Sequence, residues 1–364
     1  MSGASDAIRQ RVWLRVQRAF DAARTCRERM DLFRHHPAPI VLAVSGGPDS
    51  LCLADAILTQ ADALGLAPAI AHLDHGLRGE ASRADAEFTR AFASARGAPF
   101  FGEQADVAGL ATATRASIEV AARRARYDFL TRAARAFDAS LIGLAHHADD
   151  QAETVLLRLI RGAGITGLRA MQPLSPHPSA PGLYLIRPLL QVTRAEVLAY
   201  CQARQLEPRL DETNASADHL RNRVRHELLP LLEQYNPGIR AVLARLAEIA
   251  AGDAEIVARA AEQALAQLSQ PQTQATRNRL TLDRAAWRAL PAGLQRATLR
   301  RAIQVVRGDL TDLKLAAIDE ARDVLNSDAR AGVIALRPDA RIEVSPTQFT
   351  CVIDCAPQQA GGGS

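Results

Sequence analysis

The stretch IVLAVSGGPDS, residues 40–50, changes from a purely apolar half to a half of small and polar residues. Residues 40–44 form a short apolar run rich in β-branched side chains, which predicts a buried strand of a parallel sheet. From Ser50 onward, apolar residues recur at helical spacing as far as Gly65, a residue type that commonly ends helices. The sequence therefore predicts a strand, a tight turn and a helix in succession.

The turn has the composition of an anion-binding loop, with two hydroxyls, two glycines, a proline and a carboxylate: Ser45, Gly46, Gly47, Pro48, Asp49 and Ser50. The glycines let the backbone turn sharply and approach a ligand without a Cβ in the way. The hydroxyls and the first N–H groups of the helix would cradle a phosphate. A Walker loop is excluded because its Gly-Lys-Ser/Thr ending is absent. An ordinary strand-to-helix turn is the alternative, and the hydroxyls and the carboxylate favour phosphate.

Length and composition limit the kinds of protein that this sequence can encode. The chain has 364 residues, 48% of them hydrophobic, which is long for one domain and ample for a core. No apolar run approaches the length of a membrane span. Residues 1–37 lack the apolar stretch of a signal peptide and have the spacing of an amphipathic helix, so we expect an N-terminal helical extension.

Cysteine and arginine usage narrows the class further. The five cysteines, at positions 26, 52, 201, 351 and 355, are scattered, and no two have the two-residue spacing of a zinc or thioredoxin motif. We therefore expect a reduced, cytoplasmic protein without a structural metal. Lys314 is the single lysine among 44 basic residues, so no Walker or Schiff-base lysine is available elsewhere. Arginine suits phosphate and nucleic-acid backbones better.

The pattern of a strand followed by a helix repeats along the first half of the chain. Further strands are expected in APAIAHLDHG, APFFGEQAD, ASLIGLAHHADD and LYLIRPLL, and further helices over residues 82–97, 112–137 and 149–164. This alternation predicts an α/β fold with a doubly wound, mostly parallel sheet. Ligands of such sheets bind beyond the carboxyl ends of the strands.

Two polar clusters follow expected strands. His72, Asp74 and His75 end the second strand, and HHADDQAET, residues 146–154, ends the fourth. Because the carboxyl ends of parallel strands share one edge of a sheet, both clusters should lie near the 45–50 loop. A solvated turn is the alternative interpretation of the first cluster, but two histidines, an aspartate and an arginine at the carboxyl end of a strand favour a functional site.

The second cluster also suits a metal ion, since histidine and aspartate are common ligands. His146 and His147 are adjacent and diverge on an extended backbone, which argues against a zinc ion held by both. Asp149, Asp150 and Glu153 suit a magnesium ion that holds phosphates. Acidic residues that stabilise a helix N-terminus are the alternative interpretation.

SGGPDS resembles the PP-loop of the ATP pyrophosphatase superfamily, which cleaves ATP to AMP and pyrophosphate. The longer series AHLDHGLRGEAS, EVAARRARYDFL, HHADDQAETVLLRLIRGAG, IRPLL and DETNASADHLRNRVRHELLPLLEQYNP resembles the tRNA(Ile)-lysidine synthetases, in which these motifs occur in this order. The resemblance is strong over residues 38–240 and weaker over about the next hundred. One departure is Ala145, where glycine is common before the two histidines.

The resemblance implies a two-step reaction. ATP would adenylate the C2 carbonyl oxygen of the wobble cytidine in an isoleucine tRNA with a CAU anticodon, and pyrophosphate would leave. The amino group of free L-lysine would then displace AMP to give lysidine. ATP and Mg²⁺ are the implied substrate and ion, and the resemblance leaves open whether the chain acts as a homodimer.

The resemblance also implies roles by motif position. The loop residues 45–50 and His72 are assigned to ATP, with Asp49 as a candidate magnesium ligand. Asp150 and Glu153 are assigned to metal or to the lysine ammonium, with Asp150 favoured for metal and Glu153 for lysine.

Two histidines and five arginines complete these assignments. His75 and His146 are candidates for proton transfer. The arginines, assigned to tRNA or phosphates, are Arg123, Arg126, Arg221, Arg223 and Arg225. An exposed helix face is the alternative for Arg123 and Arg126 in so arginine-rich a chain.

We expect four segments along the chain. They are a helical extension over residues 1–37, a PP-loop catalytic domain over 38–220, a smaller, mainly helical tRNA-binding domain over 221–355, and a flexible tail over 356–364. The small domain should end in a β-meander over residues 332–354.

Two other functions are possible for a chain with this loop: a different tRNA-modifying enzyme and a protein that binds without catalysis. A tRNA 2-thiocytidine-type thiolation enzyme shares the SGGxDS loop but needs a Cys-x-x-Cys pair and an iron–sulfur cluster, which the cysteine spacing does not support. A non-catalytic nucleotide- or RNA-binding protein would bind ATP without releasing pyrophosphate. The acidic and histidine clusters favour an enzyme over this second rival.

Overall fold

The computed structural model of the chain describes residues 2–25, 31–76, 80–209, 219–269, 278–310 and 313–353. The chain forms two compact units, residues 1–251 and 252–364. The expected tail at residues 356–364 lies outside the described residues, as do Cys26 and Cys355. Within the described ranges, no helix combines the length and the apolar character needed to cross a bilayer.

The first unit is built on a six-stranded sheet with the order β3-β2-β1-β4-β6-β5. Its strands are β1 Ala38–Ala43, β2 Leu66–Asp74, β3 Phe100–Gln104, β4 Leu141–Gly143, β5 Leu174–Pro176 and β6 Tyr184–Ile186. All neighbours pair in parallel except β5 and β6. The prediction of a doubly wound, mostly parallel sheet is confirmed, and the antiparallel edge strand β5 was not predicted.

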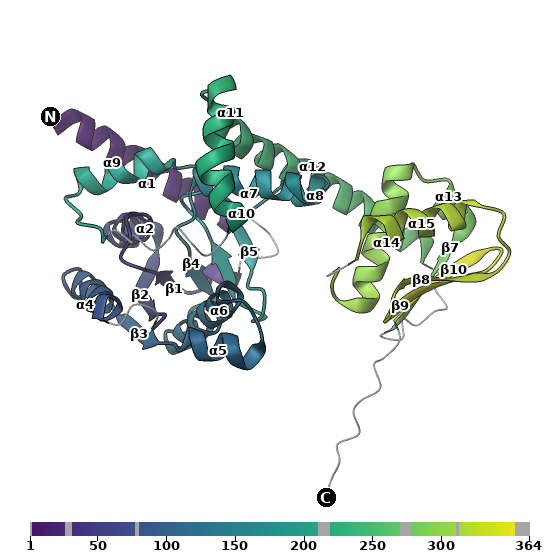
Figure 1. Cartoon of the computed structure of the whole chain (residues 1–364), viewed down its shortest axis with the longest axis horizontal. Coiled ribbons are helices and arrows are strands. Elements are labelled where there is room, and N and C mark those ends of the chain that lie inside the picture. The colour runs from purple at the N-terminus through teal and green to yellow at the C-terminus, as the bar shows by residue number, and fades with distance from the viewer. Residues whose placement is uncertain are drawn as a thin grey trace, which may run out of the picture. The chain divides into compact units, whose positions relative to one another are not determined.

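Helices cover both faces of this sheet (Figure 1). The helices of the first unit up to residue 203 are α1 Ser2–Thr25, α2 Pro48–Thr59, α3 Ala61–Leu64, α4 Glu80–Ser94, α5 Val107–Thr114, α6 Ile118–Ala136, α7 Ala148–Ile160, α8 Ile165–Leu168 and α9 Arg194–Ala203. Figure 1 shows α1, α2 and α9 on one face and α5 and α6 on the other. This arrangement leaves the carboxyl ends of the strands free to carry polar segments.

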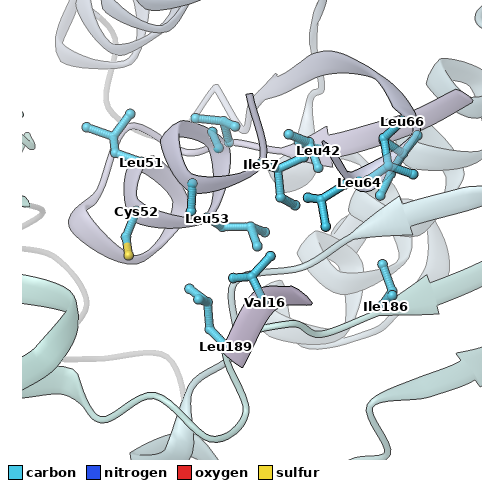
Figure 2. Packing of buried hydrophobic residues seen from close by; sticks show 14 of the residues in the cluster. Val16, Leu42, Leu51, Cys52, Leu53, Ile57, Leu64, Leu66, Ile186 and Leu189 are labelled. Carbon is cyan, nitrogen blue, oxygen red and sulfur yellow. The ribbon is translucent and has the colours of Figure 1, made fainter. Parts of the chain in front are cut away.

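The two faces of β1 explain how the layers are held. Ile40 and Leu42 pack with α1, α2 and α9 in one apolar cluster, whereas Val41 packs with Phe129 of α6 in another. Successive residues of a strand point to opposite faces, so a strand buried on both sides must be apolar throughout. Figure 2 shows Leu42 beside Ile57 of α2.

One expected helix is two helices in the structure. The sequence predicts a continuous helix over residues 112–137, but α5 ends at Thr114 and α6 begins at Ile118. Arg115 adopts a left-handed conformation, with φ of 51°, and the Ser117 hydroxyl accepts a hydrogen bond from the Val120 N–H. A serine cap therefore starts a new helix where apolar spacing alone suggests continuity.

The unit boundary lies further along the chain than the sequence indicates. The expected boundary is 220/221, whereas the chain divides after Ala251. The segment between comprises α10 His219–Arg223, the π-helical turn η3 Val224–Leu228, α11 Leu229–Tyr235 and the start of α12 Ile239–Leu268. Apolar side chains from η3, α11 and α12 are buried with those of α7, which explains why this segment belongs to the first unit.

The second unit has a four-stranded antiparallel sheet with the order β7-β10-β9-β8. Its elements are β7 Arg279–Asp283, α13 Arg284–Arg288, α14 Ala292–Arg307, α15 Leu315–Asn326, β8 Gly332–Arg337, β9 Ala340–Val344 and β10 Gln348–Ile353. The expected meander is present as β8, β9 and β10. Trp287, fully buried, contacts Phe349 edge to face with ring centroids 5.5 Å apart.

Arg284 is 2% exposed and joins separate parts of the second unit. Its guanidinium donates to backbone carbonyls at the end of α15, in the following turn and at Ser345. Burial lowers the pKa of Arg284, and these carbonyls satisfy its donors without a carboxylate. Arg284 therefore has a structural role.

Asp55 is the corresponding buried charge of the first unit, with no exposed surface. Its carboxylate accepts hydrogen bonds from Tyr200 Oη at 2.9 Å, Arg204 Nε at 2.7 Å and Arg96 Nη2 at 3.1 Å. Tyr200 and Arg204 lie on α9 and at its end, and Arg96 follows α4. This cluster fixes α2, the helix that begins at the 45–50 loop, relative to both neighbours.

We predict that Asp55→Asn lowers the free energy of unfolding by about 3 kcal/mol, because it leaves two arginines without a counter-charge. Tyr200→Phe removes one hydrogen bond and should lower that free energy by about 1 kcal/mol. Urea unfolding measures both changes. An Asp55→Asn protein as stable as the unaltered chain would contradict this role.

Candidate active site

The 45–50 loop leaves β1 and enters α2 in a conformation that requires glycine at position 46. Gly46 has φ of 90°, in the left-handed region that favours glycine, and Gly47 caps α2. The hydroxyls fold the loop upon itself: the Ser45 N–H donates to Ser50 Oγ at 3.2 Å, and Ser50 Oγ donates to the Gly47 carbonyl at 2.9 Å. The first-turn N–H groups of α2 then lie at the centre of a loop that can receive an anion.

Asp49 lies in the first turn of α2 and forms an ion pair with Arg194, the first residue of α9. The Arg194 N–H also donates to Asp149 Oδ2 at 2.8 Å. Arg194 therefore joins two acidic segments 100 residues apart in the sequence. Our sequence analysis missed Arg194. The local pattern TRAE, a capping box at residues 193–196, could have indicated a helix start at this position.

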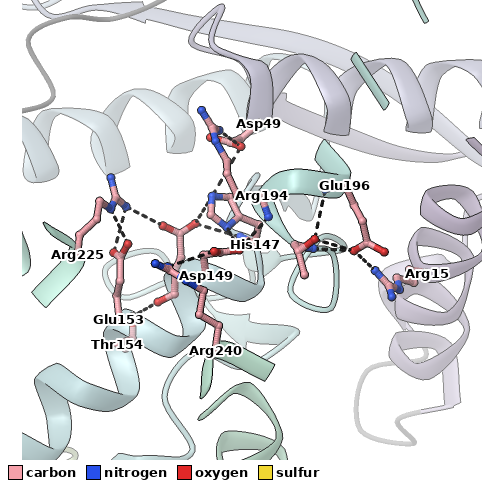
Figure 3. Close-up of polar contacts among 12 residues, drawn as sticks. Arg15, Asp49, His147, Asp149, Glu153, Thr154, Arg194, Glu196, Arg225 and Arg240 are labelled. Atoms are coloured by element: carbon pink, nitrogen blue, oxygen red, sulfur yellow. Dashed lines mark hydrogen bonds and ion pairs between the residues drawn. The ribbon is translucent and has the colours of Figure 1, made fainter. Parts of the chain in front are cut away.

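The start of α9 is itself fixed by charge. Glu196 accepts a hydrogen bond from the Thr193 N–H at 2.9 Å and forms an ion pair with Arg15 of α1. Figure 3 shows this chain of contacts running from Arg15 through Glu196 to the residues around Asp49. The N-terminal helix thus supports the position of Arg194.

His147 is surrounded by three carboxylates. Its Nε2 lies 3.7 Å from Asp49 Oδ1 and 3.5 Å from Asp150 Oδ2, and its Nδ1 lies 3.7 Å from Asp149 Oδ2. The imidazole is 5% exposed. His146 is the expected proton-transfer residue of this pair and stays a prediction, while His147 is the histidine that lies near Asp49. No sequence rule separates two adjacent histidines without the backbone geometry.

His146 lies in a different electrostatic environment. Burial, opposed by Asp150 and reinforced by Arg187, Arg221 and Arg126, lowers the pKa of His146 from 6.5 to about 4. At neutral pH the imidazole is therefore uncharged and only a weak base.

Asp150 and Glu153, one turn apart on α7, are held by two arginines of α10 and η3. Arg225 Nε lies 2.5 Å from Glu153 Oε1, and Arg221 Nε lies 2.9 Å from Glu153 Oε2. Arg225 Nη2 is 3.4 Å from Asp150 Oδ1. The Glu153 side chain is only 1% exposed, so both guanidiniums offset a carboxylate that is almost out of water. The hydrogen bonds that Arg225 donates to Glu153 raise the pKa of Arg225.

Asp150 stays ionised despite its surroundings. Burial alone would raise its pKa, but His147, His146, the His147 N–H and Arg221 together lower it. The neighbouring Asp149 also forms an ion pair, since Arg240 Nη1 of α12 lies 3.2 Å from its Oδ1. Figure 3 shows Arg225 against Glu153 and Arg240 against Asp149.

The remaining expected residues lie at the same end of the sheet or on α6. His72, 4% exposed, lies on β2 with Nδ1 2.9 Å from the Val44 carbonyl, and burial lowers its pKa. His75 follows the last residue of β2. Arg123 donates to Tyr127 Oη at 3.2 Å, and burial lowers the pKa of Arg126.

The expected arginines thus separate into groups. Arg221 and Arg225 contact the α7 carboxylates, whereas Arg223 forms a surface ion pair with Glu227 at 3.1 Å. Arg221 and Arg225 are four residues apart and share a helix face, whereas Arg223 is two residues from each and faces away from the carboxylates.

The strand–loop–helix geometry of residues 38–59 agrees with the result of a comparison with protein families. The PP-loop domain family matches residues 20–232. The chain belongs to the PP-loop family. Its PP-loop is the 45–50 loop, and the expectation from the sequence is confirmed.

Relatives of this PP-loop protein include two bacterial tRNA(Ile)-lysidine synthases. The enzyme of Geobacter sulfurreducens is 43% identical over 299 residues, which cover 82% of this chain and 61% of the relative. The enzyme of Dehalococcoides mccartyi is 36% identical over 292 residues, which cover 80% and 61%. The chain thus spans about three fifths of the length of these relatives.

A solved structure supports the fold assignment alone. The U34-tRNA thiolase NcsA from Methanococcus maripaludis, solved with its [4Fe-4S] cluster, superposes with a TM-score of 0.53 at 17% identity. The superposition covers 67% of this chain and 79% of the thiolase. The two proteins share the PP-loop architecture.

The lowered pKa of His146 makes a prediction about acid stability. Between pH 6.5 and 4 the unfolded chain binds a proton at this side chain and the folded chain does not, so stability falls as the pH falls through that window. In His146→Gln, the slope of the free energy of unfolding against pH should be shallower by about 1.4 kcal/mol per pH unit. Urea titrations at several pH values measure both slopes. Parallel slopes would show that His146 is not held neutral.

Proposed function

We propose that the chain is a tRNA(Ile)-lysidine synthase, a ligase that forms a carbon–nitrogen bond. In the first step, the C2 oxygen of the wobble cytidine of a CAU-anticodon tRNA attacks the α-phosphorus of ATP, and pyrophosphate leaves. In the second, the amino group of L-lysine attacks C2, loses a proton, and AMP leaves with the oxygen. The observation that carries this proposal is the meeting of Asp49, His147, Asp150 and Glu153 beside the PP-loop.

The PP-loop suits the first step. Cleavage at the α-phosphorus requires a grip on pyrophosphate, and the first-turn N–H groups of α2 with the hydroxyls of Ser45 and Ser50 offer one. Arg194 is close enough to Asp49 to contact the same phosphates once they arrive. In this role Arg194 would exchange one anion, the carboxylate, for another.

Asp49 and Asp150 fit a magnesium ion bound together with the phosphates. Their carboxylates flank Nε2 of His147 at 3.7 and 3.5 Å. The described residues contain no preformed group of three metal ligands, and Mg²⁺ does not require one, because it commonly binds through one or two carboxylates and phosphate oxygens. When bound, the ion would offset charge on the leaving pyrophosphate.

The pairing of acids and arginines on α7 and η3 suits free lysine. Lysine carries an ammonium and a carboxylate, so a site that offers both signs of charge can hold both ends. We assign the ammonium to Glu153 and the carboxylate to Arg221 or Arg225. At neutral pH the ammonium must lose a proton before or during attack, and Glu153 and Asp150 are the carboxylates able to accept it.

The tRNA assignment extends to Arg123, Arg126 and Arg223, which lie on helices near the site and offer donors for phosphates. ATP, free lysine and tRNA are met together in the cytoplasm, where we place the reaction. The second unit would add contacts to the tRNA.

A thiolation enzyme is the less favoured candidate. Of the described cysteines, Cys52, Cys201 and Cys351 are all buried, and burial raises the pKa of each thiol. A thiolate that carries sulfur or binds a cluster needs the opposite shift. The similarity to a thiolase structure concerns the fold.

One assay tests the proposal: AMP and pyrophosphate release together with lysine incorporation into a tRNA that bears a CAU anticodon. A tRNA with a different wobble base is the matched substrate control, and Asp49→Asn is the matched protein control. We expect lysine incorporation with the CAU substrate alone and none with Asp49→Asn. Tight ATP binding without pyrophosphate release would favour the non-catalytic alternative, and dependence on a sulfur donor would favour thiolation.

Separating the two half-reactions tests the two acids of α7. Asp150→Asn should reduce pyrophosphate release first, because it removes a metal ligand. Glu153→Gln should raise the lysine concentration required for half-maximal incorporation by roughly tenfold, with a smaller effect on ATP, because it removes one charge that attracts the ammonium. Pyrophosphate release and lysine incorporation are measured separately in each variant. Equal loss of both signals in Glu153→Gln would mean that Glu153 only anchors the arginines.

A further inference from the structure

A contact behind the PP-loop has no part in the chemistry described above. After α9 the chain returns toward the loop, and the Arg209 N–H donates to the Gly46 carbonyl at 3.1 Å. The Arg209 Nε forms an ion pair with Asp85 Oδ1 of α4 at 2.5 Å. Arg209 therefore attaches the loop, through its backbone, to α4, through its side chain.

The burial of the pair is asymmetric. The Asp85 side chain is 12% exposed and the Arg209 side chain is 43% exposed. Asp85 is therefore the buried partner of this ion pair, and Arg209 is the partner that extends to it from the solvent-exposed side. A carboxylate this enclosed is unfavourable without its partner, so the ion pair restricts where Arg209 can lie.

The position of Arg209 restricts one peptide of the PP-loop. In a planar trans peptide the carbonyl of one residue and the N–H of the next point in opposite directions. A hydrogen bond that holds the Gly46 carbonyl toward Arg209 therefore directs the Gly47 N–H to the opposite side of the loop. Gly46, at φ of 90°, has no side chain of its own to fix this peptide.

The α4 helix packs against the loop on the same side. A Cβ on Gly46 would lie 3.6 Å from the Phe88 ring and 3.7 Å from Thr89 Oγ1, both on α4 one turn beyond Asp85. Asp85 is also among the charges that act on His72, whose Nδ1 lies 2.9 Å from the Val44 carbonyl. The Asp85 charge therefore acts close behind the 45–50 loop.

We propose that Arg209 and Asp85 are positioning residues for the PP-loop. The ion pair holds the Gly46–Gly47 peptide in the orientation that presents the Gly47 N–H to the nucleotide phosphates, and it offsets part of the Asp85 charge behind them. Neither residue touches the nucleotide. The inference rests on the proposed binding of ATP by this loop.

Equilibrium binding of an ATP analogue with a methylene bridge between the α- and β-phosphates tests this role without turnover. Arg209→Ala should raise the Kd for the analogue roughly tenfold, because both the orientation and the neutralisation are lost. Arg209→Lys should recover part of the affinity. Asp85→Asn should weaken binding less than Arg209→Ala, because it removes the charge along with the anchor. The double variant Asp85→Asn/Arg209→Ala should bind no more weakly than Arg209→Ala, since both changes disrupt one interaction.

Arg132→Ala is the matched control. Arg132 forms an ion pair with Glu103 at the same 2.5 Å, between α6 and β3 of the same unit, and its side chain is 52% exposed. We expect Arg132→Ala and Arg209→Ala to lower the unfolding midpoint of the ligand-free protein to a similar extent. The analogue should then raise the midpoint of Arg132→Ala as much as that of the unaltered chain, and that of Arg209→Ala less.

Two negative results have different meanings. If the unaltered chain binds the analogue and Arg209→Ala binds it equally well, the positioning role is wrong and the proposed function stands. If the unaltered chain does not bind the analogue, the proposed function fails, and this inference fails with it. A full loss of affinity in Arg209→Lys as well as in Arg209→Ala would also overturn the role, because it would indicate a direct contact with the phosphates.

Discussion

Because β1 pairs in parallel with β2 on one side and with β4 on the other, the segments that follow these strands leave the sheet at one edge. Those segments carry the PP-loop, the polar residues around His72 and His75, and the acidic start of α7. Each is unremarkable by itself, since a glycine turn or a helix with acids in its first turn is common. Parallel pairing converts three separate stretches into one site.

The carboxylates of the candidate site are held close together because arginines compensate their charge. Asp49, Asp149, Asp150 and Glu153 approach one another around His147 and α7, and each has an arginine partner: Arg194, Arg240, Arg221 or Arg225. Without these partners the negative charges of the carboxylates would repel one another. The same ion pairs define what a bound ligand must replace. A bound phosphate would replace a carboxylate as the partner of an arginine. A bound metal ion or ammonium would replace an arginine as the partner of a carboxylate.

Buried charges also determine the rigidity of the elements around the site. Asp55 fixes α2 to α9 and to the end of α4, and Arg209 attaches the loop at the start of α2 to the same α4. Arg15 supports α9 through Glu196. These contacts hold the first turn of α2 against its neighbours, which would suit the proposed binding of phosphates in one geometry. The arginine-rich composition therefore serves the scaffold as much as the ligand.

The sequence by itself determined the fold class and the members of the site that belong to local patterns. Apolar runs identified β1, β2 and β4, and the order of strand and helix required a parallel sheet, so the loop and the acids of α7 could be assigned to one edge in advance. It did not determine the break at Arg115, because a single left-handed residue and a serine cap outweigh apolar periodicity. Only the tertiary structure decided which charges meet. Arg194 pairs with Asp49 across 145 residues and Arg225 with Glu153 across 72, separations over which sequence spacing carries no information. Which of His146 and His147 lies among the carboxylates likewise depends on backbone direction and packing, which exist only once the chain has folded.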